Sequence, residues 1–478
     1  MEQVNGQDAT FLYREKARAP LHSSSLQIFD QSSAPNGKVG FKQILAHVES
    51  RLGQFPRARQ KVAFVPLNMD HPYWVEDPEF DIEFHVRHIS LPEPGDWRQL
   101  CIQVARLHAR PLDLGRPLWE MYVIGGLSKV DGLPEGSFAI LTKIHNAAMG
   151  ETQRRKDTMR PINEAILDES PDVAEQIDNK KWAPERQPLP AELALRAWFN
   201  NLVQPFKMAR VLSEVGPGSR ITKALSVGGL GGAPKTRFNR KVSPHRVIDG
   251  VAFDLKTLSD IKEVVTGATV NDVVIALIGG ALRKYLHAKS EVPGETMLAV
   301  APVTVETRNN KTQVVDMRVP LSTHIDDALE RLEAVRDAIQ ASGTADRAVR
   351  AQLLTDFNEH APAMTAALAS RLYANMGSDL LSWITPPFNA TITNVPGPQV
   401  PLYLAGARMV TKHGLGALTD GAGLNFTALS YCGELTITLT TCRAMVKDPA
   451  YFAVCLEESF EDLVRASADR RSRRKKVA

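Results

Sequence analysis

The sequence predicts an α/β protein made of two layered domains that are joined by a long crossover. Its 478 residues exceed what one hydrophobic core usually supports. Its apolar fraction of 44% and charged fraction of 23% are those of an ordinary globular protein. Segments with the two-residue period of strands alternate with segments of helical spacing on both sides of a stretch at residues 183–245 that is rich in proline and glycine.

The first domain is expected to span residues 1–182. Its predicted elements are a short helix at 5–15, a strand at 24–29, a helix at 41–52, two extended pieces within 74–89, a helix at 97–108, and strands at 121–124 and 138–145. Apolar residues at positions 41, 44, 45, 48 and 52 define one face of the second helix. In the last strand, Ile140 and Ile144 alternate with Lys143 and His145, as in a strand of period two.

The crossover at residues 183–245 contains a helical run at 191–212 and then a glycine-punctuated segment with little periodicity. The second domain is expected at 246–466. Its predicted elements are strands at 247–253, 297–305, 389–395, 424–430 and 434–442 and helices at 255–265, 273–286, 326–342, 346–374 and 448–466. Asn271 or Asp272 can cap the apolar helix that begins at 273.

The charge of the chain is concentrated at its end. The formal net charge is +3, and residues 469–476 alone carry six basic side chains against one acid, so the remainder is close to neutral. This basic tail at 467–478 is a solvated terminus or a segment attracted to anionic lipid headgroups. We expect no nucleic-acid partner. The sequence does not indicate an oligomeric state.

The cysteines and the apolar windows limit the class of protein. The four cysteines show no CxxC pair and no metal-ligand spacing, so we expect no metal, no cofactor and a reducing compartment. The first thirty residues lack the apolar core of a signal peptide, and no window approaches eighteen uncharged apolar residues. We therefore expect a cytoplasmic protein that is soluble or peripheral at the inner membrane or at lipid inclusions.

The candidate catalytic residues lie where the strand at 138–145 ends. His145 is followed by Asn146, three small or apolar residues and Gly150. An imidazole at the exit of a rigid strand, before a turn, is well placed to act as a general base in a cleft. The alternative is a hydrogen-bonded structural histidine.

Several short motifs in order along the chain resemble those of the bacterial wax ester synthase/acyl-CoA:diacylglycerol acyltransferase family. They are Pro20-Leu21-His22, Pro117-Leu118-Trp119-Glu120, the strand that leads into His145, Val270-Asn271-Asp272-Val273, Thr393-Asn394-Val395-Pro396-Gly397-Pro398 and Pro401-Leu402-Tyr403-Leu404-Ala405-Gly406-Ala407. Each motif alone is weak, whereas their joint order over nearly the whole chain is specific.

The resemblance implies a fold, a reaction and a set of partners. The fold is that of the CoA-dependent acyltransferases, with two chloramphenicol-acetyltransferase-like domains and an active-site tunnel at their interface. The reaction is transfer of a long acyl group from acyl-CoA, as co-substrate, to a fatty alcohol or to diacylglycerol. It proceeds with a histidine general base and without an acyl-enzyme.

The active-site motif departs from the family pattern. The family reads His-His-x-x-x-Asp-Gly, and this chain reads His145-Asn146-Ala147-Ala148-Met149-Gly150. Aligned from the strand, Asn146 stands at the catalytic second histidine. Aligned from Gly150, His145 takes the catalytic position and Met149 replaces the aspartate. We adopt the first alignment, because a shift of one residue turns every strand side chain to the opposite face.

Five further residues are candidates for substrate contact or support. Asn394 and Asn271 are possible donors to the oxyanion of the tetrahedral intermediate, although Asn394 also suits a turn before Pro-Gly-Pro. Asp272 is a helix cap or a substrate contact. Pro117 and Trp119 are expected to support the site by core packing.

Three hypotheses of function remain open. The first is an O-acyltransferase that makes wax esters or triacylglycerol. The second is a catalytically impaired or silent relative that binds acyl-CoA or lipid, which Asn146 favours because an amide cannot accept a proton near neutral pH. The third is a condensation-type enzyme that acts on carrier-bound thioesters, which the order of the motifs disfavours.

Overall fold

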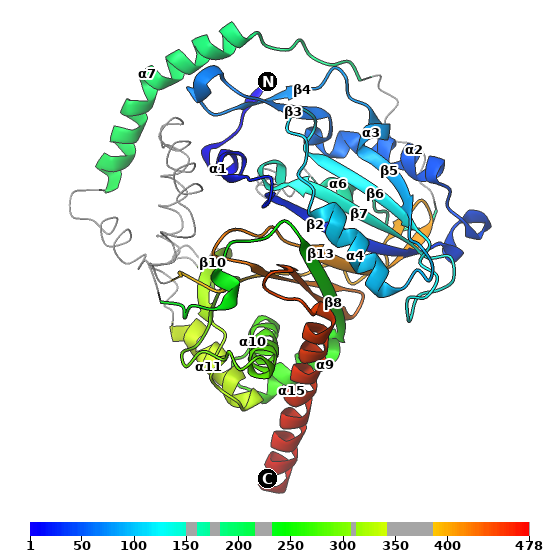
Figure 1. Ribbon diagram of the computed structural model, residues 1–478, viewed down its shortest axis with the longest axis vertical. Coiled ribbons are helices and arrows are strands. Elements are labelled where there is room, and N and C mark those ends of the chain that lie inside the picture. Colours follow the sequence, from blue (N-terminus) through cyan, green and yellow to red (C-terminus); the bar gives the residue numbers. More distant parts are fainter. Residues whose placement is uncertain (150–159, 173–181, 216–231, 307–311, 342–385, 478) are drawn as a thin grey trace. The chain divides into compact units, whose positions relative to one another are not determined.

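The computed structural model describes residues 1–149, 160–172, 182–215, 232–306, 312–341 and 386–477 (Figure 1). The chain forms two compact units. Unit 1 comprises Met1–Ser226, Gln352–Gly377 and Pro401–Lys412, and unit 2 comprises Val227–Ala351, Ser378–Val400 and His413–Ala478. In the described residues, no helix has the length and apolar character needed to cross a membrane.

Unit 1 is built on a mixed six-stranded sheet. Its order is β12 (Tyr403–Leu404), β13 (Ala407–Leu415), β2 (His22–Asp30), β7 (Phe138–His145), β6 (Trp119–Gly125) and β5 (Val86–Ser90). A small second sheet joins β1 (Glu2–Gln3), β4 (Tyr73–Glu76) and β3 (Gln60–Ala63). The helices are α1 (Gly6–Arg14), α2 (Phe41–Arg51), α3 (Ile82–His85), α4 (Trp97–His108), α6 (Ile162–Ala165) and α7 (Pro190–Val215).

The central strand of unit 1 is β7, and all eight of its side chains are buried. It pairs antiparallel with β2 on one side and with β6 on the other. A strand that is covered on both faces must carry compatible side chains on both, which explains the mostly apolar sequence of β7. Polar residues of β7 therefore need partners inside the unit.

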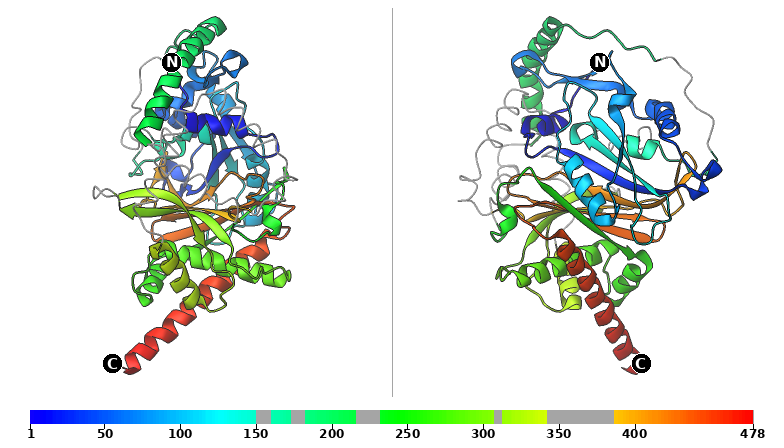
Figure 2. Two further views of the ribbon diagram at one scale, coloured as in Figure 1. Left: turned by 90° about the vertical axis from the view of Figure 1, so that its left-hand side faces the viewer. Right: turned by 45° about the vertical axis from the view of Figure 1, so that its right-hand side comes forward.

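Unit 2 contains a second six-stranded sheet. Its order is β10 (Thr312–Pro320), β9 (Leu298–Glu306), β11 (Ala390–Val395), β14 (Leu424–Tyr431), β15 (Glu434–Cys442) and β8 (Arg246–Asp254). The helices α9 (Leu255–Val264), α10 (Val270–Ala288), α11 (Ala328–Ala341) and α15 (Pro449–Val477) gather on one face of this sheet (Figure 2). Short 3-10 turns occur at Gln31–Ser33, Pro35–Gly37, Leu52–Gln54, Pro56–Arg59, Pro66–Asn68 and Arg237–Asn239.

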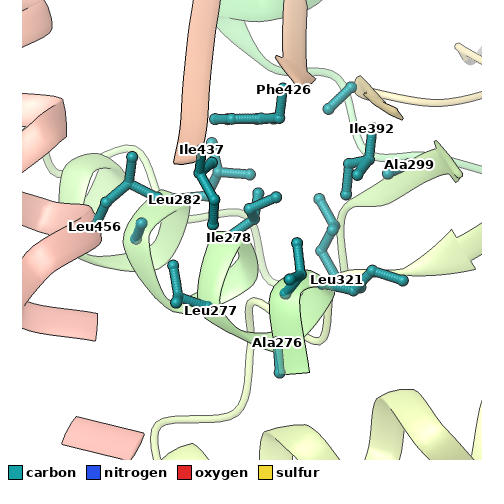
Figure 3. Close-up of a cluster of buried hydrophobic side chains, with 14 of the residues drawn as sticks. Ala276, Leu277, Ile278, Leu282, Ala299, Leu321, Ile392, Phe426, Ile437 and Leu456 are labelled. Atoms are coloured by element: carbon teal, nitrogen blue, oxygen red, sulfur yellow. The ribbon is translucent and has the colours of Figure 1, made fainter. Parts of the chain in front are cut away.

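The core of unit 2 forms around α10, which is apolar on nearly all sides (Figure 3). Its side chains meet residues from the sheet and from α15, among them Ala299, Ile392, Phe426, Ile437 and Leu456. Two glycines of α10 permit close packing. A Cβ on Gly279 would lie 2.1 Å from the Leu321 carbonyl oxygen, and a Cβ on Gly280 would lie 2.2 Å from Ser459 Oγ. Larger residues at either position would push neighbouring elements away from the helix.

The prediction of an α/β protein with two sheet-containing layered domains is confirmed. The strands β1, β3, β10, β12 and β13 were missed, and the helix expected at 346–374 lies outside the described residues. The helix within the expected crossover, α7, packs on unit 1. The last helix, α15, continues through most of the expected basic tail at 467–478.

The cap of α10 is a correction to the expectation from sequence. Thr269 is the N-cap, and its hydroxyl accepts the amide N–H of Asp272 at 3.2 Å. The Asp272 carboxylate in turn accepts the amide N–H of Thr269 at 2.8 Å. This reciprocal arrangement is a capping box, in which Asp272 takes part three residues inside the helix. Asn271 is free for another role.

Candidate active site

The imidazole of His145 is fully enclosed where β7 ends. Its side chain is 0% exposed, and its backbone N–H donates to the Leu118 carbonyl at 3.0 Å. Ring atom Nδ1 accepts the amide N–H of Ala147 at 3.1 Å. Because Nδ1 uses its lone pair in this bond, the neutral ring carries its proton on Nε2.

Glu15 faces the other side of this ring. One carboxylate oxygen of Glu15 lies 3.5 Å from His145 Nε2, which makes no hydrogen bond in the described part of the chain. The second carboxylate oxygen accepts the backbone N–H of Leu21 at 3.0 Å. Glu15 follows the end of α1, so this carboxylate links α1, the start of β2 and the end of β7.

Asn146 begins the turn after β7 and has a partly exposed side chain. Its amide oxygen accepts the Ser23 hydroxyl at 2.8 Å, and its backbone N–H donates to the Leu21 carbonyl at 3.0 Å. Residues 146–149 continue as helix, and Gly150 lies outside the described residues. Asn146 is therefore the first position after β7 whose side chain has access to the surroundings.

The Pro117-Leu118-Trp119 segment supports this turn from the neighbouring strand. The Leu118 carbonyl accepts the His145 amide N–H, and Pro117 is buried. Trp119 is 0% exposed, stacks on His85 with ring centroids 4.7 Å apart, and donates from its indole N–H to the Ala58 carbonyl at 2.8 Å. The expectation that Trp119 packs in the core is confirmed.

A second histidine lies directly across the sheet from His145. His22 of β2 is the cross-strand partner of His145, and its Nε2 donates to the His108 carbonyl at 2.8 Å. Burial lowers the pKa of His22 well below its ordinary value, and the nearby His108, Lys143 and His145 lower this pKa further. His22 is therefore neutral in the folded chain near neutral pH.

The same face of β7 buries a charged pair. Lys143 is fully enclosed and donates to the Arg110 carbonyl at 2.8 Å and to the Glu120 carboxylate at 3.2 Å. Burial lowers the pKa of Lys143, which Glu120 opposes. Tyr122 also donates to Glu120 at 2.9 Å, and burial, followed by Glu120, raises the pKa of Tyr122 to about 12.

The remaining predicted residues form a separate group in unit 2. The Asn394 side chain, on β11, donates to the Asn271 side-chain oxygen on α10 at 3.0 Å, although 123 positions separate the two residues. Burial raises the pKa of Asp272, while the Thr269 hydrogen bonds oppose this shift. The structure thus brings Asn271 and Asn394 together and places Asp272 in the cap.

The turn after Asn394 requires its glycine. A Cβ on Gly397 would lie 2.0 Å from the Ser430 carbonyl oxygen, a distance that no side chain tolerates. The Gly397 amide donates to Ser430 Oγ at 3.0 Å, which fixes the turn on β14. The Pro-Gly-Pro sequence therefore positions the end of β11, on which Asn394 lies.

Sequence reasoning missed Glu15 and Ser23. A single acid at the end of a short helix has no recognisable spacing to a histidine 130 positions later. The one signal in this part of the chain is the Pro20-Leu21-His22 motif, which directly precedes Ser23 and begins five positions after Glu15.

The arrangement of sheets is found in known acyltransferases. The trichothecene 15-O-acetyltransferase of Fusarium sporotrichioides superposes with a TM-score of 0.54 at 14% identity, covering 98% of this chain and 95% of that one. A wax ester synthase/diacylglycerol acyltransferase from Marinobacter aquaeolei VT8 superposes with a TM-score of 0.66 at 26% identity, covering 98% and 100%. The fold is that of the CoA-dependent acyltransferases with two layered domains.

The sequence matches narrow the class to one family. Residues 4–274 match the wax ester synthase/diacylglycerol acyltransferase catalytic domain, and residues 312–464 match the C-terminal domain of the same family. The chain belongs to the wax ester synthase/diacylglycerol acyltransferase family of acyltransferase enzymes. A probable diacylglycerol O-acyltransferase of Mycobacterium tuberculosis is 30% identical over 476 residues, which cover 98% of this chain and 99% of that protein. A putative one from the same species is 29% identical over 486 residues, covering 98% and 91%.

Proposed function

We propose that this chain transfers a long acyl group from acyl-CoA to the hydroxyl of a fatty alcohol or of diacylglycerol. The observation that carries the proposal is the family match, which covers both units. The names of the Marinobacter and Mycobacterium relatives support the two classes of acceptor. Acyl-CoA is the co-substrate, and the proposed reaction uses no acyl-enzyme.

The proposed chemistry needs one proton acceptor. The acceptor hydroxyl oxygen attacks the thioester carbonyl carbon while a base takes the hydroxyl proton. The tetrahedral intermediate then collapses, the carbon–sulfur bond breaks, and the base returns the proton to the leaving CoA thiolate. Hydrogen-bond donors stabilise the oxyanion of the intermediate. Asn394 is our candidate for such a donor, because Asn271 fixes the orientation of its amide.

His145 as the base stays a prediction with a defined requirement. A base needs a free lone pair directed at the acceptor hydroxyl, and the lone pair of His145 Nδ1 already accepts the Ala147 N–H at 3.1 Å. The ring is also 0% exposed. His145 could act only after the ring gave up this bond and turned toward the substrate.

These contacts favour a second candidate function, a family member with impaired turnover that binds acyl-CoA or lipid. Asn146 is the first partly exposed position after β7, where the family pattern aligned from the strand has its second histidine. Its amide oxygen accepts only hydrogen bonds, here from Ser23, and cannot take up a proton near neutral pH. In this reading His145 is a positioning residue.

One set of variants separates the two candidates. Release of CoA is measured with palmitoyl-CoA and either hexadecanol or dioleoylglycerol, for the wild type and for His145→Ala, Asn146→His and Asn146→Ala. If His145 is the base, His145→Ala abolishes release while Asn146→Ala retains it. If the turn lacks a base, wild-type release is close to that of both alanine variants, and Asn146→His raises it by about a hundredfold or more.

A titration with palmitoyl-CoA completes the experiment. Binding without CoA release assigns the chain to the impaired class. Absence of both binding and release, in protein that remains folded by circular dichroism, would reject both candidates.

A further inference from the structure

The helix α7 is held against unit 1 by a small apolar cluster. Leu193 and Ala197 of α7 are 4% and 0% exposed and pack against Val65, Tyr73 and Val75. These two α7 residues lie four positions apart, on one side of the helix. This inner side of α7 is therefore part of the folded unit.

Polar contacts fix the rotation of α7 about its axis. The Asn200 side chain donates to the Asp70 carboxylate at 2.7 Å and to the Tyr73 hydroxyl at 3.2 Å. The Asn201 side chain donates to the Met69 carbonyl at 2.9 Å. Because these bonds tie consecutive residues to the 69–73 segment, the opposite side of the helix is held outward.

The outward side of α7 is apolar. Leu195, Trp198, Phe199 and Leu202 are 58%, 57%, 55% and 51% exposed. Their spacing of three, four and seven positions places them in one stripe along the helix. We call these four residues the outer face of α7. Singly scattered apolar residues are normal at a surface, whereas a contiguous stripe with two aromatic side chains marks an interaction site.

The composition of the outer face suits a lipid surface better than a protein. Its four side chains expose roughly 400 Å², which is about half of what one partner buries in a standard protein interface. Trp198 offers its only hydrogen-bonding group, whereas protein interfaces carry about one hydrogen bond per 100–200 Å². Tryptophan and phenylalanine on one side of a helix are typical of helices that lie in the membrane interface.

The charges at the start of α7 do not select anionic partners. Arg186 pairs with Glu192, and Arg196 is exposed beside them. Because charges of both signs are present, we expect the outer face to bind its partner through apolar contact and not through net charge.

We propose that the outer face of α7 seats unit 1 on a phospholipid membrane. The proposal rests on the proposed function, because fatty alcohols and diacylglycerols are insoluble in water and reside in membranes. α7 lies in the membrane interface with Trp198 and Phe199 inserted among the headgroups and upper acyl chains. The contact needs no basic tail and no spanning segment.

The test uses the full-length protein and phosphatidylcholine vesicles, which carry no net charge. Flotation of the protein together with the vesicles is measured in about 0.5 M salt, which screens the attraction of the basic residues at 469–476 to lipid. The wild type is compared with Trp198→Ser/Phe199→Ser and with a matched control, Ile102→Ser. Ile102 is an apolar residue of α4 that is 42% exposed. We expect the double variant to lower the partition coefficient by at least about tenfold and the control to leave it unchanged.

Trp198 also reports its own position. Vesicles of brominated phosphatidylcholine quench tryptophans that enter the bilayer. We expect the wild type to show this quenching and Trp198→Phe to show none. The Trp198→Phe variant keeps an aromatic side chain at this position and should still float with the vesicles.

Three outcomes would overturn the proposal. The double variant could float like the wild type, the Ile102→Ser control could lose as much binding, or gel filtration without lipid could show that the double variant dissociates an oligomer of this chain. The last outcome would make the outer face a protein interface. None of these readouts measures acyl transfer, so a chain that binds vesicles without releasing CoA refutes the proposed reaction and leaves the membrane contact standing.

Discussion

The amide N–H of Ala147 donates to Nδ1 of His145, two residues earlier, at 3.1 Å. This bond joins the last residue of β7 to the first helical residues that follow it, and it sets the tautomer of the imidazole. The ring then presents an N–H, and not a lone pair, to the Glu15 carboxylate 3.5 Å away. His145 thus contributes to the shape of the turn in the observed arrangement.

Replacing His145 should destabilise unit 1. His145→Ala leaves a cavity and an unpaired Ala147 amide in a fully buried place, so we expect a loss of about 2–4 kcal/mol in the free energy of unfolding. Urea unfolding followed by tryptophan fluorescence measures this loss. Asn146→Ala, at a partly exposed neighbour, is the control and should cost less than about 1 kcal/mol. Equal stability of the two variants would contradict the structural role of His145.

The Asn271–Asn394 contact should be measurable as a coupling. Single alanine variants and the double variant form a cycle, because each removes one side of the 3.0 Å hydrogen bond. We expect a coupling free energy of about 1 kcal/mol in the unfolding of unit 2. Additive effects of the two substitutions would show that the side chains do not interact in solution.

The start of α10 should depend on the hydroxyl of Thr269 and not on Asn271. Thr269→Ala removes the group that accepts the Asp272 amide N–H, at an expected cost of about 1 kcal/mol. Thr269→Ser keeps the oxygen and should retain most of the stability. Thermal unfolding by circular dichroism compares the two variants. A larger effect of the serine variant would reject the capping box.

The buried histidines should make the protein less stable in mild acid. Burial lowers the pKa of His413 from 6.5 to about 4. The unfolded chain therefore binds the proton first as the pH falls. The stability associated with neutral His413 is fully present above pH 6.5 and is lost progressively down to about 4. Within this window the loss is about 1.4 kcal/mol per pH unit for this one group.

Urea unfolding at several pH values between 7.5 and 5 measures the slope. His413→Gln should reduce the slope of the unfolding free energy against pH by the contribution of one histidine. The matched control is His324→Gln, at an exposed histidine. An unchanged slope in His413→Gln would show that His413 does not resist protonation in the folded state.

Local patterns predicted most elements and missed several strands, among them β13, whose partner β2 is distant in the sequence. The apolar periodicity of β7 and α4 is carried by consecutive residues, so the sequence predicted the bounds of both elements as the structure has them. β13 (Ala407–Leu415) carries Arg408, Lys412 and a glycine, which weaken the two-residue period. It becomes a strand because it adjoins β2, almost four hundred positions earlier, in the sheet of unit 1. Such a partner is invisible to any local window.

The candidate site shows the same limit. The sequence marked the turn after β7 and the Asn271 and Asn394 motifs, and the structure shows that the two asparagines meet. It did not mark Glu15 or Ser23, because their importance lies in contacts with residues far away in the sequence and not in local spacing. The tautomer of a histidine and the use of its lone pair likewise depend on the three-dimensional contacts of the ring. The sequence could not show that His145 Nδ1 already accepts a hydrogen bond, so it predicted His145 as a base.

Since every side chain of β7 is packed within unit 1, the strand is a poor place to redesign the enzyme. A suitable junction for chimaeras with relatives lies between His145 and Asn146. A chimaera that keeps the chain through His145 and takes its next residues from a relative would inherit a new turn on an unaltered support. Such transplants offer a direct way to alter the chemistry of this chain without rebuilding its interior.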